Sequence, residues 1–243
     1  MPSFGRPLAP ISSADWLNYV DKGKKMFARE SWSLKQYTTQ EVLDLSARID
    51  RALSGPGGSV LLAGRSGVGR RESLCVVSAL HSARLVHLKM GKNFGIKQFK
   101  NDLKAVMQLS GVEEEQIFMV IEDQNLIEDH FLDLVNSLLS SGEIPGLYSP
   151  EEMEPLLTPL KQNATNAGYS GDAFSFFAMN VKKNLHLALL MDCSSPDFVI
   201  RCESNPALYK ECTILWTADL SPDTFFSLPA AILSSKVMTR KKF

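Results

Sequence analysis

Hydrophobic residues along this chain recur in two different patterns, and the two patterns alternate. Short, mostly apolar runs rich in Val, Ile and Leu predict strands that are buried on both faces of a sheet. Between these runs, apolar residues lie three or four positions apart with charged residues between them, which predicts amphipathic helices. The predicted strands cover residues 59–63, 85–88, 117–121, 185–191 and 213–217.

The predicted helices precede and separate these strands. They cover residues 15–27, 42–53, 70–81, 96–109 and 129–140, with two more near residues 151–164 and 172–183. Strands that alternate with helices favour a parallel sheet joined by right-handed crossovers. We therefore predict an α/β fold in which helices cover both faces of a parallel five-stranded sheet.

Two segments fall outside this alternation. Residues 1–14 begin with a stretch rich in Pro and Gly, and we expect them to form a flexible N-terminal segment. Residues 142–184 separate the third and fourth strands and are too long to be a loop, so we expect a helical insertion there. The remainder, residues 15–243, is expected to form one large α/β domain.

The composition excludes several classes of partner. The net charge is -1, so neither nucleic acid nor an acidic membrane surface is expected to bind. No apolar run approaches the roughly 20 residues of a transmembrane helix, and the first residues lack the apolar core of a signal peptide. The four cysteines form no close C-x-x-C pair, which favours reduced thiols in the cytosol. The four histidines are scattered, so no metal site is expected from them.

The segment that follows the first strand carries the main chemical signal. It opens a predicted helix, which is the context that the phosphate-binding pattern G-x-x-x-x-G-K-[ST] requires. Its glycines would let successive N–H groups turn toward phosphate oxygens at a helix N-terminus. We therefore predict ATP or ADP binding, although a glycine-rich turn without a ligand is the alternative for so short a pattern. The candidate binding residues are Gly64, Arg65, Ser66, Gly67, Val68, Gly69, Arg70 and Arg71.

This segment departs from the pattern at its last two positions. Arg70 replaces the lysine, and its planar guanidinium cannot act as a point charge between the outer phosphates. Arg71 replaces the Ser or Thr whose hydroxyl would ligate Mg²⁺, and it brings a second cation close to the metal position. Ser73 lies about 200° further round the helix and cannot take over this role. The sequence leaves the participation of Mg²⁺ open.

Two other strand ends carry acidic residues. The third strand ends in Glu122 and Asp123, where P-loop ATPases have Asp followed by Glu. The exchange lengthens a possible Mg²⁺ ligand and withdraws the base that would polarise water. The fourth strand ends at Asp192, where an Asn would donate to phosphate and an ionised Asp can only accept. The alternative is a solvated strand end in which Asp123 or Asn125 caps the next helix.

Several segments together resemble an AAA+ module of a dynein heavy chain, most closely the fourth module of the motor ring. The most specific is the run DLVNSLLSSGEIPGLY at residues 133–148. Further similarity lies in residues 47–51 with Gly57 and Gly58, in Ser194 and Ser195, and in residues 184–191, 204–208 and 212–216. The similarity extends from about residue 15 to residue 233. The phosphate loop, the exchanged acids and the end of the fourth strand look most like the heavy chains of retrograde intraflagellar transport.

The resemblance implies a function for the chain. It implies a piece of a minus-end-directed microtubule motor of the cytoplasm, cytoskeleton and cilium, with neighbouring AAA+ modules as partners and microtubules reached through a stalk elsewhere. The fold would be the large AAA+ subdomain with the helical lid largely absent, since nothing after residue 225 looks long enough. Glu211 stands where relatives carry an arginine that reaches the neighbouring module, and Lys210 could replace it only in part.

Three functions remain in competition after this comparison. The first is a regulatory module that binds nucleotide and hydrolyses little or none, because Glu122, Asp123 and Asp192 are altered together at the catalytic positions. The second is a purely structural ring module with an empty pocket, or one filled by Arg70 and Arg71. The third is a free-standing P-loop kinase or ATPase, which the altered positions disfavour.

Overall fold

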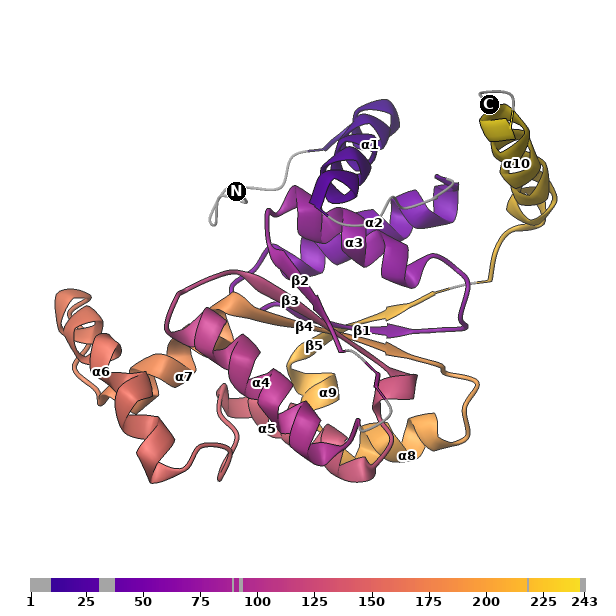
Figure 1. Ribbon diagram of the computed structural model, residues 1–243. Helices are drawn as coiled ribbons and strands as arrows, with labels where there is room; N and C mark the ends of the chain where they lie inside the picture. Colours follow the sequence, from indigo (N-terminus) through magenta and orange to yellow (C-terminus); the bar gives the residue numbers. More distant parts are fainter. Residues whose placement is uncertain (1–9, 31–37, 89, 92–93, 218, 241–243) are drawn as a thin grey trace.

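A parallel sheet between two layers of helices forms the body of the protein (Figure 1). The computed structural model describes residues 10–30, 38–88, 90–91, 94–217 and 219–240. Five strands pair in the order β2-β3-β4-β1-β5, and every pairing is parallel. The strands are β1 (Ser59–Ala63), β2 (Arg84–His87), β3 (Ile117–Glu122), β4 (Leu185–Met191) and β5 (Cys212–Trp216).

The strand order decides which chain segments meet. β4 lies between β3 and β1, in register from Val60 opposite Ala188 to Ala63 opposite Met191 on one side. All residues of β1 and β4 are buried, as expected for central strands that are covered on both faces. The loops that follow β1, β3 and β4 therefore emerge side by side at the carboxyl edge of the sheet.

Two hydrophobic layers hold the helices on the sheet (Figure 1). On one face lie α1 (Ser13–Glu30), α2 (Gln40–Leu53) and α3 (Arg70–Leu80). α2 buries Val42, Leu45, Ile49 and Leu53, which recur every three or four residues and so share one side of the helix. On the other face lie α4 (Ile96–Gly111), α5 (Asp129–Ser141), α7 (Ala173–Asn184), α8 (Asp197–Ser204) and α9 (Ala207–Lys210).

The segment between β3 and β4 extends the second layer. It contains α6 (Pro150–Asn166) and α7, and α6 projects from the body (Figure 1). The turn after α5 packs closely here, since a Cβ on Gly142 would lie 2.4 Å from the carbonyl oxygen of Ala178 in α7. Lys104 of α4 reaches Glu152 of α6 at 2.7 Å. The two helices expected for residues 142–184 are therefore present and are held against the main layer.

The predicted strands and helices are all found, with small changes at their ends. β2 and β5 each begin and end one residue earlier than predicted, and α1 begins at Ser13. Residues 1–9 of the expected flexible segment lie outside the described residues. The sequence pattern missed α8 and α9, which are short, and α10 (Pro222–Arg240), which contains Pro229. The segment after residue 225 thus continues one long helix, where nothing long was expected.

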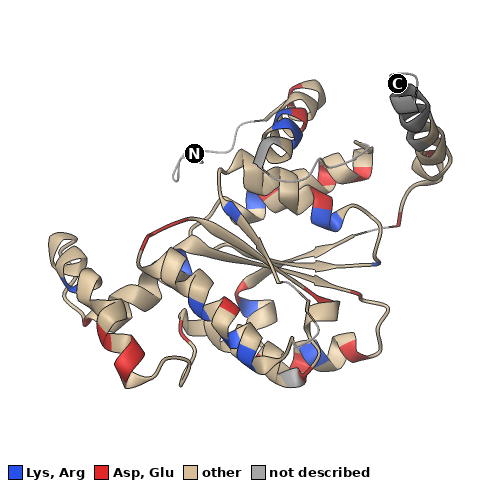
Figure 2. Ribbon diagram, in the orientation of Figure 1, with Lys and Arg blue, Asp and Glu red and all other residues tan. Residues whose placement is uncertain are grey.

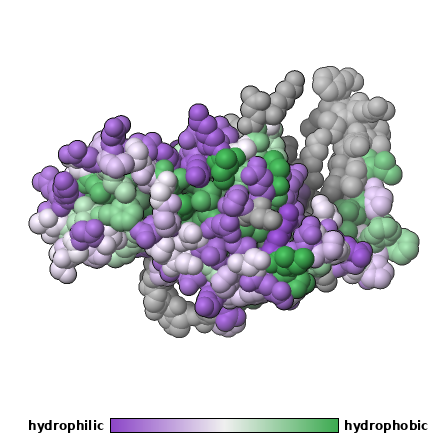
Figure 3. All heavy atoms as spheres, turned by 90° about the horizontal axis from the view of Figure 1, so that it is seen from below, coloured by the Kyte–Doolittle hydropathy of each residue, from purple (hydrophilic) through white to green (hydrophobic). Residues whose placement is uncertain are grey.

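Charged side chains lie on helices on both sides of the sheet, with both signs present, and the strands carry few (Figure 2). Seen from below, the molecule shows several hydrophobic patches separated by hydrophilic residues (Figure 3). α8 contributes two exposed apolar side chains, Val199 and Ile200. Among the described helices, none is long and apolar enough to cross a membrane.

Glu41 in the first turn of α2 holds the start of α10. Its carboxylate accepts hydrogen bonds from the Ser221 backbone N–H at 3.0 Å and from the Thr224 hydroxyl at 2.9 Å. Burial by itself raises the pKa of Glu41, but the hydrogen bonds outweigh it and lower this pKa to about 2. The Glu41 carboxylate of α2 thus caps the start of α10, which lies near the other end of the chain.

We expect Glu41→Gln to lower stability at neutral pH by about 1.5–3 kcal/mol, the usual range for hydrogen bonds to a charged group. Because the folded pKa of Glu41 lies below the unfolded value, its contribution is complete above about pH 4.5 and is lost as the pH falls toward 2. Urea unfolding at pH 7 and pH 3 measures the free energy of unfolding of the wild type and the variant. The stability difference between wild type and variant should shrink to less than half at pH 3. Glu154→Gln on an exposed part of α6 is the control, and an unchanged difference would contradict the assignment.

Candidate functional site

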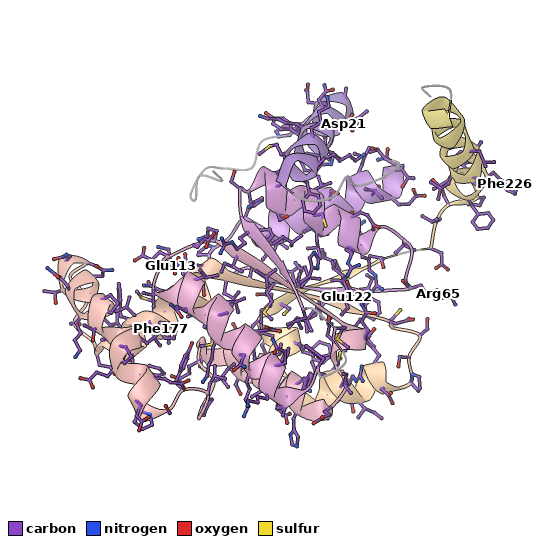
Figure 4. The ribbon with its side chains drawn as sticks, in the orientation of Figure 1. Asp21, Arg65, Glu113, Glu122, Phe177 and Phe226 are labelled. Atoms are coloured by element: carbon purple, nitrogen blue, oxygen red, sulfur yellow. The ribbon has the colours of Figure 1, made fainter. Side chains whose placement is uncertain are left out.

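The carboxyl edge of the sheet holds a cavity of about 440 Å³. This volume lies within the range of about 300–1,000 Å³ that is usual for small-molecule sites. Figure 4 shows Glu122 near the centre of the molecule, at the end of β3. The cavity is lined by Ser66, Gly67, Gly69, Arg70, Arg71, Glu72, Glu122, Asp123, Gln124, Leu190 and Asp192.

The loop between β1 and α3 has the backbone shape of an anion cradle. Gly67 adopts a φ of +89°, which side-chain-bearing residues rarely tolerate, and a Cβ placed there would meet nothing within 4 Å. At Gly64 the constraint is a close approach, since a Cβ would lie 1.8 Å from the Thr217 hydroxyl at the end of β5. The loop leads directly into α3, whose first residues line the cavity and whose first N–H groups have no partner within the helix. These backbone features fit a phosphate group.

Arg70 does not extend freely into the cavity. One nitrogen of its guanidinium donates to the carbonyl oxygens of Leu62 at 2.9 Å and Met191 at 2.8 Å. The residue is 8% exposed. Burial lowers the pKa of Arg70, while the carboxylates of Asp123 and Asp192 act against this shift. Arg70 therefore ties the ends of β1 and β4 together and presents positive charge at the cavity wall.

Arg71 and Glu122 form an ion pair at the cavity. The guanidinium nitrogen Nη2 lies 2.6 Å from Oε1 of Glu122. This contact does not run along an N–H bond, so Oε1 remains without an aligned hydrogen-bond donor. The other oxygen, Oε2, accepts from the Gln124 side-chain amide at 2.9 Å. Glu122, in the expected Mg²⁺-ligand position, thus has one oxygen in an ion pair and the other in a hydrogen bond, both with side chains of its own chain.

Asp123, the residue directly after β3, is held by partners from two other parts of the fold. Its Oδ1 lies 3.3 Å from Nη1 of Arg201 in α8, and its Oδ2 accepts the backbone N–H of Asp192. Asp192 in turn accepts the backbone N–H of Ser194 at 2.8 Å. The carboxylate in the base position is therefore oriented by β4 and α8.

Not every residue predicted for the site faces the cavity. Arg65 is exposed, lies at the edge of the molecule in Figure 4, and is 3.9 Å from Asp219. Val68 is buried, Gly64 packs against Thr217 just after β5, and neither lines the cavity. Glu211, where the sequence resemblance would expect an arginine, pairs with Lys182 of α7 at 3.4 Å. The exposed Lys210 precedes it.

The sequence analysis missed Arg201 and Gln124 as site residues. Arg201 lies 78 positions from Asp123 in the chain, on a helix that was not predicted. A weak signal was present, because Phe198 and Cys202 are four residues apart and both are buried on one side of α8. Gln124 follows the acidic pair directly and could have been considered as its hydrogen-bond donor.

The residues present do not fit a Mg²⁺ site of the usual P-loop kind. No hydroxyl stands at position 71, and the charge of Glu122 is balanced by Arg71. Within the described residues, no group of three or more His, Cys, Asp or Glu side chains could hold a metal ion. A nucleotide phosphate, by contrast, fits the loop backbone and the positive charge of the two arginines.

Comparison with known proteins identifies the family. The family model described as "P-loop containing dynein motor region D4" matches residues 37–242. The chain belongs to this dynein motor family. The strand order and the glycine loop agree with an AAA+ P-loop module, as the sequence predicted.

Individual relatives show which class of dynein heavy chain this chain is similar to. The chain is 45% identical over 234 residues to cytoplasmic dynein 2 heavy chain 1 of Homo sapiens, and 46% identical over 233 residues to that of Tripneustes gratilla. Each alignment covers 96% of this chain and 5% of the relative, so the chain spans about a twentieth of their length. Among solved structures, Cdc6p of Pyrobaculum aerophilum is similar with a TM-score of 0.48 and 14% identity, over 86% of this chain and 52% of that chain. The expected resemblance to a dynein 2 heavy-chain module is confirmed.

Proposed function

We propose that this dynein module binds ATP or ADP and regulates the motor, with little or no hydrolysis at this site. One observation carries the proposal: the glycine loop is open over a cavity of about 440 Å³, while Glu122 and Asp123 beside it are held by arginines of the same chain. Binding would use Gly67, Gly69 and the first N–H groups of α3, with Ser66, Arg70 and Arg71 beside them. Gly64 and Val68 would shape the loop, and Arg65 would lie at its rim.

Weak hydrolysis follows from the positions of the three acidic residues. Hydrolysis needs a base that orients water and a cation that balances the developing charge. Asp123, the base candidate, is turned toward Arg201 and the end of β4. Glu122 is paired with Arg71, and Asp192 can only accept hydrogen bonds when ionised. Each of these changes displaces or alters a group that hydrolysis requires. Together they favour nucleotide binding over hydrolysis as the activity of this site.

A purely structural module is the second candidate, and Arg70 is the observation that favours it. Its guanidinium joins two central strands, which is an architectural role that needs no ligand. The size of the cavity argues against this alternative, because the two arginines line the space and do not fill it. We therefore favour nucleotide binding.

The wider role is inferred from the family. The relatives reported above are cytoplasmic dynein 2 heavy chains. We propose that this chain serves in such a minus-end-directed motor, in retrograde transport along cilia. Its immediate partners would be neighbouring AAA+ modules, with microtubules bound elsewhere on the heavy chain. We assign residues 15–243 to the large AAA+ subdomain with residues 142–184 as an insertion. Pairing of Glu211 with Lys182 leaves Lys210 as the nearest candidate for contact with a neighbouring nucleotide.

Nucleotide binding is tested by thermal unfolding of this chain with ATP or ADP. At a ligand concentration a hundred times the dissociation constant, binding stabilises a protein by about 2.7 kcal/mol. For a chain of this size that corresponds to a rise in Tm of about 5–10 °C. We expect this rise with adenine nucleotides and not with adenosine, which lacks the phosphates. An unchanged Tm at millimolar ATP and ADP, with and without Mg²⁺, would favour the structural alternative.

A further inference from the structure

The ion pair between Arg71 and Glu122 places a cation of the protein where a P-loop site needs one from solution. Nη2 of Arg71 is 2.6 Å from Oε1 of Glu122, and both residues line the same cavity, from the start of α3 and the end of β3. The pair is partly exposed, with 46% of the Arg71 side chain and 21% of the Glu122 side chain accessible. A ligand in the cavity could therefore reach the guanidinium directly.

Arg71 already neutralises the acid in direct contact with it, Glu122, while Glu72 and Asp192 line other parts of the cavity. Glu122 and Arg71 sum to zero, and the remaining Glu122 oxygen is engaged by Gln124. His87, at the end of β2, is near enough for Arg71 to act on it, but burial, helped by Arg71, lowers the pKa of His87 to about 4. His87 is therefore neutral at physiological pH. A metal ion at this place would face a fixed cation and no unpaired carboxylate on β3.

The same geometry suits a phosphate oxygen. A guanidinium carries five N–H donors, and the contact with Glu122 is made through Nη2. The remaining donors can bind phosphate oxygens while the ion pair is kept, and Arg-to-phosphate hydrogen bonds are among the strong ones because both partners are charged. Glu122 then acts as a positioning residue: it holds the guanidinium at the cavity wall.

We propose that Arg71, positioned by Glu122, replaces Mg²⁺ as the countercharge of the nucleotide, so that ADP and ATP bind this site without a divalent cation. This inference rests on the proposed nucleotide binding. Beyond nucleotide binding, it adds one property that can be measured separately, namely how the affinity for the nucleotide depends on Mg²⁺.

The experiment is a titration of this chain with ADP by calorimetry, in buffer with excess EDTA and in buffer with millimolar Mg²⁺. For the wild type we expect the two dissociation constants to agree within about threefold. For Arg71→Thr combined with Glu122→Asp, which supplies a hydroxyl and a shorter acid, we expect at least a tenfold loss of affinity in EDTA and recovery in Mg²⁺.

A matched control comes from the amino edge of the sheet, where β2 and β3 begin. Arg84 and Glu115 form an ion pair at 3.2 Å, near the start of β2 and far from the loop. Arg84→Thr combined with Glu115→Asp should behave like the wild type in both buffers. Circular dichroism and thermal unfolding verify that each variant is folded.

The outcomes separate the two proposals. Wild-type binding only in the presence of Mg²⁺ would overturn the role of Arg71 while leaving nucleotide binding intact. Unchanged EDTA affinity in the Arg71 and Glu122 double variant would overturn it as well. Absence of binding in both buffers would instead overturn the proposed function itself.

Discussion

A Gly67→Val variant is expected to lose nucleotide binding at a modest cost in stability. The backbone of Gly67 has a φ of +89°, and a Cβ there would meet no atom of the protein within 4 Å. The substitution should therefore spare the packing and cost about 1–3 kcal/mol of backbone strain. The new side chain would occupy the concave side of the loop where phosphate oxygens are proposed to lie. We expect the affinity for ADP to fall at least about a hundredfold.

Gly146→Val provides the matched comparison. Gly146 has a φ of +70°, is exposed, and likewise has open space where a Cβ would be placed. It lies in the turn after α5, away from the carboxyl edge of the sheet. Both variants should lose similar stability in urea unfolding, and only the Gly67 variant should lose the nucleotide-dependent rise in Tm. If both variants retained that rise, the loop would not be the phosphate site.

The strands were the easiest feature to predict, and the reason is physical. A strand buried on both faces has apolar side chains in both directions, so β1 and β4 stand out as continuous hydrophobic runs. Helices such as α2 are equally clear because their buried residues recur every three or four positions. α10 lacks this signal, since Phe225 and Phe226 are both exposed and Pro229 interrupts the pattern. Its first turn depends on Glu41, a contact that local sequence does not reveal.

The candidate site was predictable in its residue types and not in its contacts. The order of strands brings Gly67, Glu122 and Asp192 to one cavity, as the motif spacing had indicated. The direction of each side chain depends on partners that are distant in sequence. Arg70 turns to the carbonyl of Met191, 121 positions away, and Asp123 meets Arg201, 78 positions away. A single sequence holds no periodic or local signal for such pairs.

These contacts change the interpretation of the altered motif. In the sequence alone, Arg70 and Arg71 replace the lysine and the hydroxyl-bearing residue of the usual motif. In the folded protein each has a new partner: Arg70 joins two strands, and Arg71 neutralises the acid of β3. Restoring only one of the original residues would leave its partner unpaired, which costs more than the pair itself contributes. The positions therefore act as coupled pairs, and for this reason the Mg²⁺ test changes Arg71 and Glu122 together.

The isolated chain is expected to hydrolyse ATP at least about a thousandfold more slowly than the ~1–10 s⁻¹ of ordinary ATPases. Two separate features support this expectation. The Asp123 carboxylate is shorter than the usual base and is held by Arg201 and the N–H of Asp192. The Asp192 side chain, bound to the N–H of Ser194, offers the reacting phosphate no donor.

Release of inorganic phosphate from ATP measures this rate, with Asp123→Asn as the background. The amide keeps the size of the side chain and removes its basicity, so any release that persists in this variant comes from elsewhere. We expect the wild type and the variant to be indistinguishable while both still bind ADP. Turnover near 1 s⁻¹ that disappears in Asp123→Asn would show that the contact with Arg201 opens during the reaction and that the site is catalytic. Binding without turnover would instead support a regulatory role, in which the site acts through the nucleotide that it holds.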